Sequence, residues 1–138
     1  MSIIILQKRS KNGHGGAQTL LPDGVQVTIS HSEKQKRRDG RPYVFLRCVF
    51  GKNIPFGEYY TLGKDGEKIV IIPASKEVGF KVGKTTHSGY GAFRINLTDD
   101  TIKLLPIEWQ DKLRDGDIEF NAVFDYEGKR VLLNGIQN

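Results

Sequence analysis

The chain has 138 residues, of which 38% are hydrophobic and 27% charged, and its net charge is +5. This composition is typical of one folded domain, residues 1–138, and not of a disordered chain. No apolar run reaches the ~20 residues that cross a membrane as a helix, and the single cysteine, Cys48, excludes an intrachain disulfide and a cysteine-based zinc site. We therefore expect a cytoplasmic protein that uses no membrane, metal or cofactor, with Cys48 as a small buried side chain.

The first half of the chain carries strand patterns around a basic hairpin tip. Residues 1–8 are apolar without the basic start of a signal peptide and predict a first strand, and a glycine-rich basic loop follows at 8–16. Strand patterns at 25–29 and 42–50 then flank a cationic tip at 32–41, which contains an Asp-Gly turn signal. These segments predict a hairpin that presents cations at its end.

Two aromatic residues, Tyr43 and Phe45, lie two positions apart in the second strand of this hairpin and share one face. On an exposed face their rings could stack on the bases of single-stranded nucleic acid. We favour the alternative, in which both rings face the core while Leu46 and Cys48 face the other way with Arg47 between them. Because composition does not choose between the two faces, Tyr43 stays among the candidate binding residues.

The middle of the chain predicts a second hairpin from residues 59–62 and 67–73, and a short strand at 78–82. The segment 79–85 is similar to a phosphate-binding loop. It has three residues, not the required four, between its first glycine and Gly-Lys-Thr, and no helix pattern follows it. We therefore do not expect nucleotide hydrolysis.

The last third combines strands with a helical segment, and its strand patterns lie at 92–97, 118–124 and 129–133. Apolar spacing predicts one or two short helices near 99–114, with Thr98 or Asp99 as the cap and Trp109 as a core anchor. Either two short helices meet at Pro106, or the helix begins with Pro106 as its first residue. The whole pattern predicts a mainly β fold, a small barrel or sandwich of antiparallel hairpins.

The cations are unevenly distributed along the chain. Residues 1–52 hold ten Lys or Arg against three Asp or Glu, whereas residues 53–138 hold eleven against thirteen. This asymmetry predicts a basic surface for a polyanion, with DNA as the first candidate, although a solvated surface that aids solubility would look the same. The candidate phosphate contacts are Lys8, Arg9, Lys11, Lys34, Lys36, Arg37, Arg38 and Arg41.

A strand with the pattern Arg94-Ile95-Asn96-Leu97 leads through a short helix to Leu113-Arg114-Asp115-Gly116-Asp117, and a closing hairpin runs through 131–133. In these features residues 93–133 resemble swapped-hairpin DNA-binding domains of the AbrB/MraZ type. Thr98 stands where that family usually has a proline. The resemblance implies a homodimer of interlocked hairpins with Arg94 near DNA.

We therefore expect a nucleic-acid-binding protein that contacts phosphates through basic loops and is not an enzyme. The carboxylates at 99–100 and 115–117 fit helix-start and turn positions, and the three histidines are too dispersed for a metal site. The alternative is a small protein-interaction module, an inhibitor or assembly subunit, whose basic loop docks on an acidic protein surface.

Overall fold

The structure is a computed structural model that describes residues 21–84 and 90–137, with the side chains of residues 33–35 left out. The strand predicted at 1–8 and the basic loop predicted at 8–16 lie outside these residues. The described chain forms nine strands and two short helices. They are β1 (Val25–Lys36), β2 (Pro42–Phe50), β3 (Tyr59–Asp65), β4 (Lys68–Pro73), β5 (Phe80–Lys81), β6 (Gly83–Lys84), β7 (Gly91–Leu97), α1 (Asp99–Lys103), α2 (Ile107–Asp115), β8 (Ile118–Asp125) and β9 (Arg130–Ile136).

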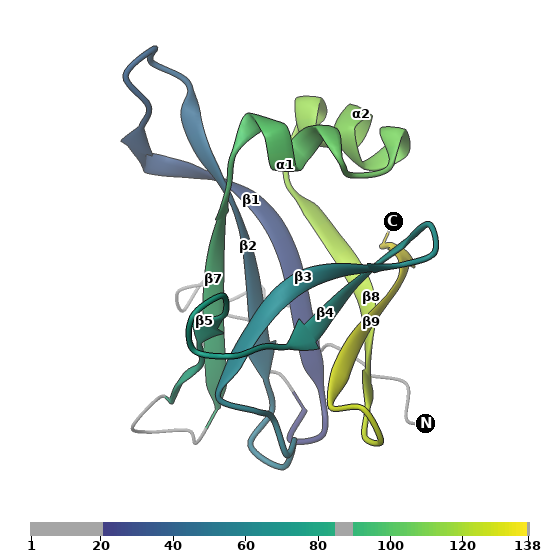
Figure 1. The fold of residues 1–138 in the computed structure, drawn as a ribbon. Coiled ribbons are helices and arrows are strands. Elements are labelled where there is room, and N and C mark those ends of the chain that lie inside the picture. Colours follow the sequence, from purple (N-terminus) through teal and green to yellow (C-terminus); the bar gives the residue numbers. More distant parts are fainter. Residues whose placement is uncertain (1–20, 85–89, 138) are drawn as a thin grey trace, which may run out of the picture.

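All nine strands belong to one antiparallel sheet in the order β5-β3-β4-β9-β8-β1-β2-β7-β6, which curls into a nearly closed barrel (Figure 1). The two edge strands are consecutive in sequence. β5 pairs with β3 and β6 pairs with β7, so residues 80–84 bring the two edges of the sheet together. Between them, buried Val82 donates its N–H to the Glu58 carbonyl at 2.9 Å. The predicted mainly β fold is confirmed, in its barrel form.

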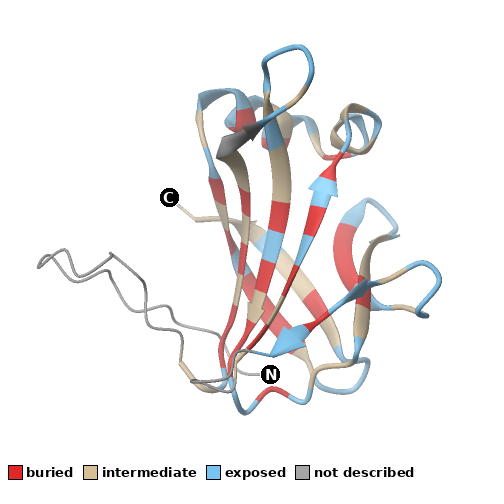
Figure 2. Cartoon of the chain, turned by 90° about the vertical axis from the view of Figure 1, so that its left-hand side faces the viewer, coloured by how far each residue is buried: buried red, intermediate tan, exposed pale blue. Residues whose placement is uncertain are grey.

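The interior of the barrel is filled by side chains that alternate along the strands. Leu46, Cys48 and Phe50 of β2 are at most 1% exposed, and β7 follows the same pattern, visible as alternating bands in Figure 2. At one end of the core the Phe50 ring stacks on Phe56, with ring centroids 5.1 Å apart, and lies 5.2 Å from the Tyr60 ring. The barrel is therefore a packed core and not a pore.

The two helices lie across one end of the barrel (Figure 1). Thr98 caps α1, its side-chain oxygen accepting the Thr101 N–H at 3.2 Å, and Pro106 immediately precedes α2. Trp109 is buried against Phe120, with ring centroids 4.6 Å apart. The first alternative for Pro106 is therefore confirmed, because two short helices meet there. The second is wrong, because Pro106 occupies the N-cap position and α2 begins at Ile107.

The β1–β2 hairpin extends beyond the barrel past the helical end (Figure 1). The strand predicted at 25–29 is too short, because β1 continues to Lys36 and only residues 37–41 form the turn. The register between the strands shifts between His31 and Lys36, and Gly40 adopts a φ of 86°, which glycine tolerates best. We call residues 32–41 the arm.

Burial makes the Cys48 thiol unreactive and raises its pKa, because the thiolate would lose its hydration. We expect no reaction of the folded protein with a disulfide reagent at pH 8, and one equivalent after denaturation. In the unfolded chain the Cys48 thiol loses its proton near pH ~8.5. The stability gained by burying the neutral thiol is therefore fully present below that pH and is lost as the pH rises. Rapid stoichiometric labelling of the folded protein would contradict this burial.

The Tyr60 hydroxyl links two loops at the barrel end away from the helices. It accepts the Gly57 N–H at 2.9 Å and donates to the Lys129 carbonyl at 2.9 Å. Tyr60→Phe leaves both groups without this partner, so we expect the free energy of unfolding in urea to fall by about 1–3 kcal/mol. Tyr126→Phe removes a hydroxyl from an exposed ring and should change stability far less. Equal effects of the two variants would show that the link contributes nothing.

Candidate nucleic-acid interface

Two of the predicted phosphate contacts in the arm are held by carboxylates. Arg37 Nη1 lies 2.7 Å from Asp99 Oδ1, and Arg41 reaches Asp99 Oδ2 at 3.1 Å and Asp39 Oδ2 at 2.7 Å. Hydrogen bonds from Arg37 and Arg41 hold the pKa of the Asp99 carboxyl below its usual range. These pairs tether the arm to the start of α1 and offset the charge of both arginines. Arg37 and Arg41 therefore serve first to position the arm.

Of the remaining predicted cations, the structure describes the side chains of some and not of others. Lys36 and Arg38 are exposed, and neither forms an ion pair with a carboxylate of the described chain. The side chain of Lys34 lies outside the described residues. The same holds for the N-terminal set, Lys8, Arg9 and Lys11. Among its described side chains, the arm thus offers Lys36 and Arg38 as cations without a carboxylate partner, beyond its tethered arginines.

The solvent-facing side of β2 carries a second group of candidates. Leu46, Cys48 and Phe50 face the core, so Tyr43, Phe45 and Arg47 face outward. The favoured interpretation of Tyr43 and Phe45 as core residues is therefore wrong. Tyr43 is 38% exposed, and Phe45 is half-buried on the outer side of the sheet.

Neighbouring strands place a second arginine beside these residues. Arg47 lies opposite Arg94 of β7, and Phe45 lies opposite Asn96. The Arg94 guanidinium carbon lies 3.7 Å from the centre of the Phe45 ring, a cation–π contact, and Arg94 Nε donates to Asn96 Oδ1 at 3.3 Å. Within the described chain, neither Arg47 nor Arg94 forms an ion pair with a carboxylate. Their charge is available to a ligand.

A shallow hollow of ≈ 440 Å³ lies beside Arg47 and Phe45. Its floor is β1, where Thr28 lies opposite Arg47 and Ser30 lies opposite Phe45. Its far wall is formed by Glu119 of β8, which accepts a hydrogen bond from Gln26 at 2.9 Å, and by Asp117 just before β8, which accepts the backbone N–H of His31 at 3.0 Å. We call this surface of β8, β1, β2 and β7 the outer face. It combines a cationic and aromatic wall, a hydroxyl floor and an acidic wall.

Arg47 was not predicted as a binding residue, although the pattern of residues along this strand contained a signal for it. It has the same odd register as Tyr43 and Phe45, and charged side chains are almost never fully buried without a partner. The register that contains Arg47 had to face solvent. Arg94 was predicted only through the family resemblance, and its place beside Phe45 depends on a pairing between strands that are far apart in sequence.

The outer face offers side chains that can bind a ligand. Its polar groups are arginines, hydroxyls, amides and two carboxylates, and the only described thiol, Cys48, is buried in the core. In residues 21–84 and 90–137 no group of three or more His, Cys, Asp or Glu side chains could hold a metal ion.

Neither described helix is long and apolar enough to cross a lipid bilayer.

Comparisons with protein-family models, with curated proteins and with solved structures find no match for this chain.

Proposed function

We propose that the protein binds single-stranded nucleic acid on the outer face, without catalysis. One observation carries the proposal: exposed Arg47 and Arg94 and half-buried Phe45 form a cluster on adjacent strands, with Arg94 stacked on the Phe45 ring. Sequence-tolerant binding of single strands combines cations that follow the phosphate backbone with rings on which bases stack. Guanidinium planes stack on bases as well.

The hollow beside the cluster supports a role for exposed bases. Thr28 and Ser30 offer hydroxyls, and the acidic wall carries the acceptor oxygens of Glu119 and Asp117. Carboxylates accept hydrogen bonds from base amino groups but repel phosphates. A bound nucleic-acid strand would therefore place its phosphates along β2 and β7 and its bases towards β1 and β8.

The arm extends this surface past the helical end of the barrel. Arg41, Tyr43, Phe45 and Arg47 share one register of β2 and its entry, and exposed Arg38 lies in the turn beyond them. Contacts of this kind add affinity and position the strand but read no sequence. The choice between DNA and RNA depends on sugar contacts, and DNA is our first candidate.

Removing the two free arginines of the outer face should weaken binding and reduce its salt dependence. For Arg47→Gln/Arg94→Gln we expect an affinity loss of about tenfold or more for a fluorescent oligothymidylate, measured by anisotropy. The slope of log affinity against log salt should become less steep by about 1.4. Each of the two lost phosphate contacts lowers the slope by about 0.7, because fewer counterions are released when the strand binds.

The matched control is Lys64→Gln/Lys68→Gln, which removes two exposed lysines from the β3–β4 hairpin and should leave affinity nearly unchanged. Lys36→Gln/Arg38→Gln tests the arm without breaking its tether to Asp99. Equal affinity of the arginine variant and the unaltered protein, at low and at moderate salt, would refute the proposal.

Replacing the ring of Phe45 should weaken binding without changing the salt slope. Base stacking on an aromatic ring contributes about 1–3 kcal/mol per base, so Phe45→Leu should lower affinity by roughly five- to hundredfold in the same assay. Tyr126→Leu, at another exposed ring, provides the control. An unchanged affinity of Phe45→Leu would mean that charge alone holds the strand.

A second candidate function, docking on a protein partner, is favoured by two large apolar side chains at the junction of the helices. Leu104 is 62% exposed and Ile107 is 70% exposed. Exposed apolar side chains of this size are typical of protein contacts when they lie together. An outer face that binds no nucleic acid, together with a one-to-one protein complex lost in Leu104→Ser/Ile107→Ser, would favour this function.

A further inference from the structure

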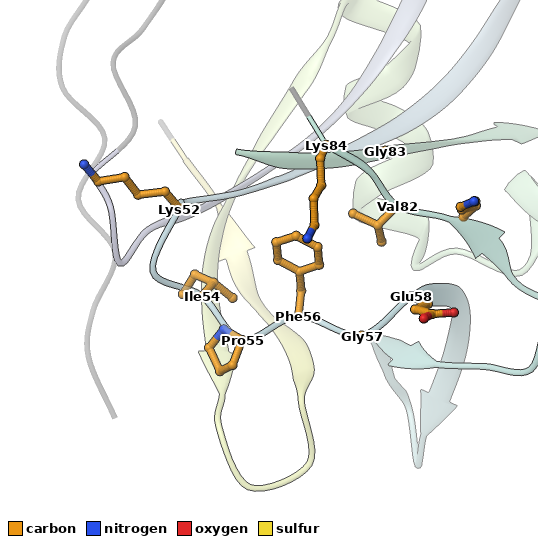
Figure 3. A pocket seen from close by; sticks show the side chains of 10 residues that line it. Lys52, Ile54, Pro55, Phe56, Gly57, Glu58, Val82, Gly83 and Lys84 are labelled. Carbon is orange, nitrogen blue, oxygen red and sulfur yellow. The ribbon is translucent and has the colours of Figure 1, made fainter. Parts of the chain in front are cut away.

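The barrel end away from the helices holds a larger hollow, of ≈ 880 Å³, which we call the mouth (Figure 3). It lies between the β2–β3 connection, residues 51–58, and the segment 80–84 that joins the sheet edges. Its volume is within the range of small-molecule sites. The mouth thus has the size of a ligand site on a separate part of the molecule from the outer face.

The walls of the mouth are held by the packed core. Phe56 stacks on the buried Phe50 ring, with centroids 5.1 Å apart. A Cβ atom at Gly91 would come within 2.5 Å of the Phe56 ring, so glycine there allows the ring its place. The N–H of Gly57 is held by the Tyr60 hydroxyl at 2.9 Å. The apolar wall is therefore formed before any ligand arrives.

The charge of the mouth is positive. Lys52 comes from the β2–β3 connection and Lys81 and Lys84 from the segment 80–84, and Glu58 is the only carboxylate among the described lining residues. None of the three lysines forms an ion pair with a carboxylate of the described chain. Lys84 extends over the Phe56 ring, whereas Lys52 extends outward at the rim (Figure 3). Three lysines against one glutamate give the lining a net charge of +2, which favours a multiply charged anion.

We propose that the mouth binds a phosphate monoester that is attached to an aromatic ring system, as in a nucleotide. The lysines would neutralise its two negative charges, and the apolar wall of Phe56 and Val82 would contact the ring. A monocarboxylate fits less well, because it carries one charge and only two acceptor oxygens. The site would bind its ligand without bond breaking.

Two sources could supply this chemistry, a free nucleotide or the phosphorylated end of a strand. The pairing of β6 with β7 places Lys84 opposite Gly91, three residues along β7 from Arg94. At about 3.4 Å per residue this is roughly 10 Å along the sheet. A strand on the outer face could therefore end in the mouth, but a free nucleotide would bind whether or not the outer face binds nucleic acid.

The test is titration calorimetry with AMP, with adenosine and with short oligothymidylates that carry either a terminal phosphate or a hydroxyl at each end. Binding of AMP but not adenosine would support the site with a free nucleotide as its source. A gain in affinity from a terminal phosphate, without AMP binding, would support it with a strand end as its source. In either case Lys52→Gln/Lys81→Gln/Lys84→Gln should reduce the phosphate-dependent binding by about tenfold or more, because each change removes a charge-assisted hydrogen bond.

The control Lys64→Gln/Lys68→Gln/Lys76→Gln removes three exposed lysines elsewhere and should have no such effect. Thermal unfolding checks that each variant is folded, and replacing the three mouth lysines by arginine should retain binding. The proposal is overturned when neither AMP nor a terminal phosphate binds, or when the mouth and control variants behave alike. If the outer face does not bind nucleic acid, the oligothymidylates with hydroxyl ends will not bind. That result is independent of the measurement with AMP.

Discussion

The alternation of side chains along β2 is the constraint on which the rest of the molecule depends. Its even register supplies Leu46, Cys48 and Phe50 to the core, and its odd register carries Phe45 and Arg47 on the outside. A slip of one residue would bury Arg47 and expose the core set, at a cost of several kcal/mol per uncompensated buried charge. The register of β2 therefore determines both which side chains enter the core and which lie on the outer face.

Closure of the barrel is the second constraint, and it links the sheet edges to the mouth. A two-residue strand is too short to hold an edge by itself, but Val82 is buried and its N–H bonds to Glu58, so the segment 80–84 is anchored from inside. The same anchoring holds Lys81 and Lys84 on either side of the seam. Charges placed on such a fixed frame need less ordering when a ligand binds.

Local patterns in the sequence were enough to predict the hairpins, the helical cap and the burial of Cys48 and Trp109, because periodicity and capping act within a few residues. They did not predict the salt bridge of Arg37 with Asp99, which are 62 positions apart, nor the pairing that puts Arg94 beside Phe45. Those contacts depend on sheet order, which single-strand periodicity does not contain. The outward register of β2, by contrast, was available from Arg47.

The distribution of charge explains why net charge alone is a poor guide to the site. The arm is the most cationic segment in the sequence, yet its arginines Arg37 and Arg41 share Asp99 between them. Besides Arg38 of the arm, two guanidinium groups that face solvent without a described counter-ion lie on the sheet, at Arg47 and Arg94. A carboxylate that pairs with two arginines tethers the arm and offsets its charge, and the sheet is then the surface on which we propose that a nucleic-acid strand lies.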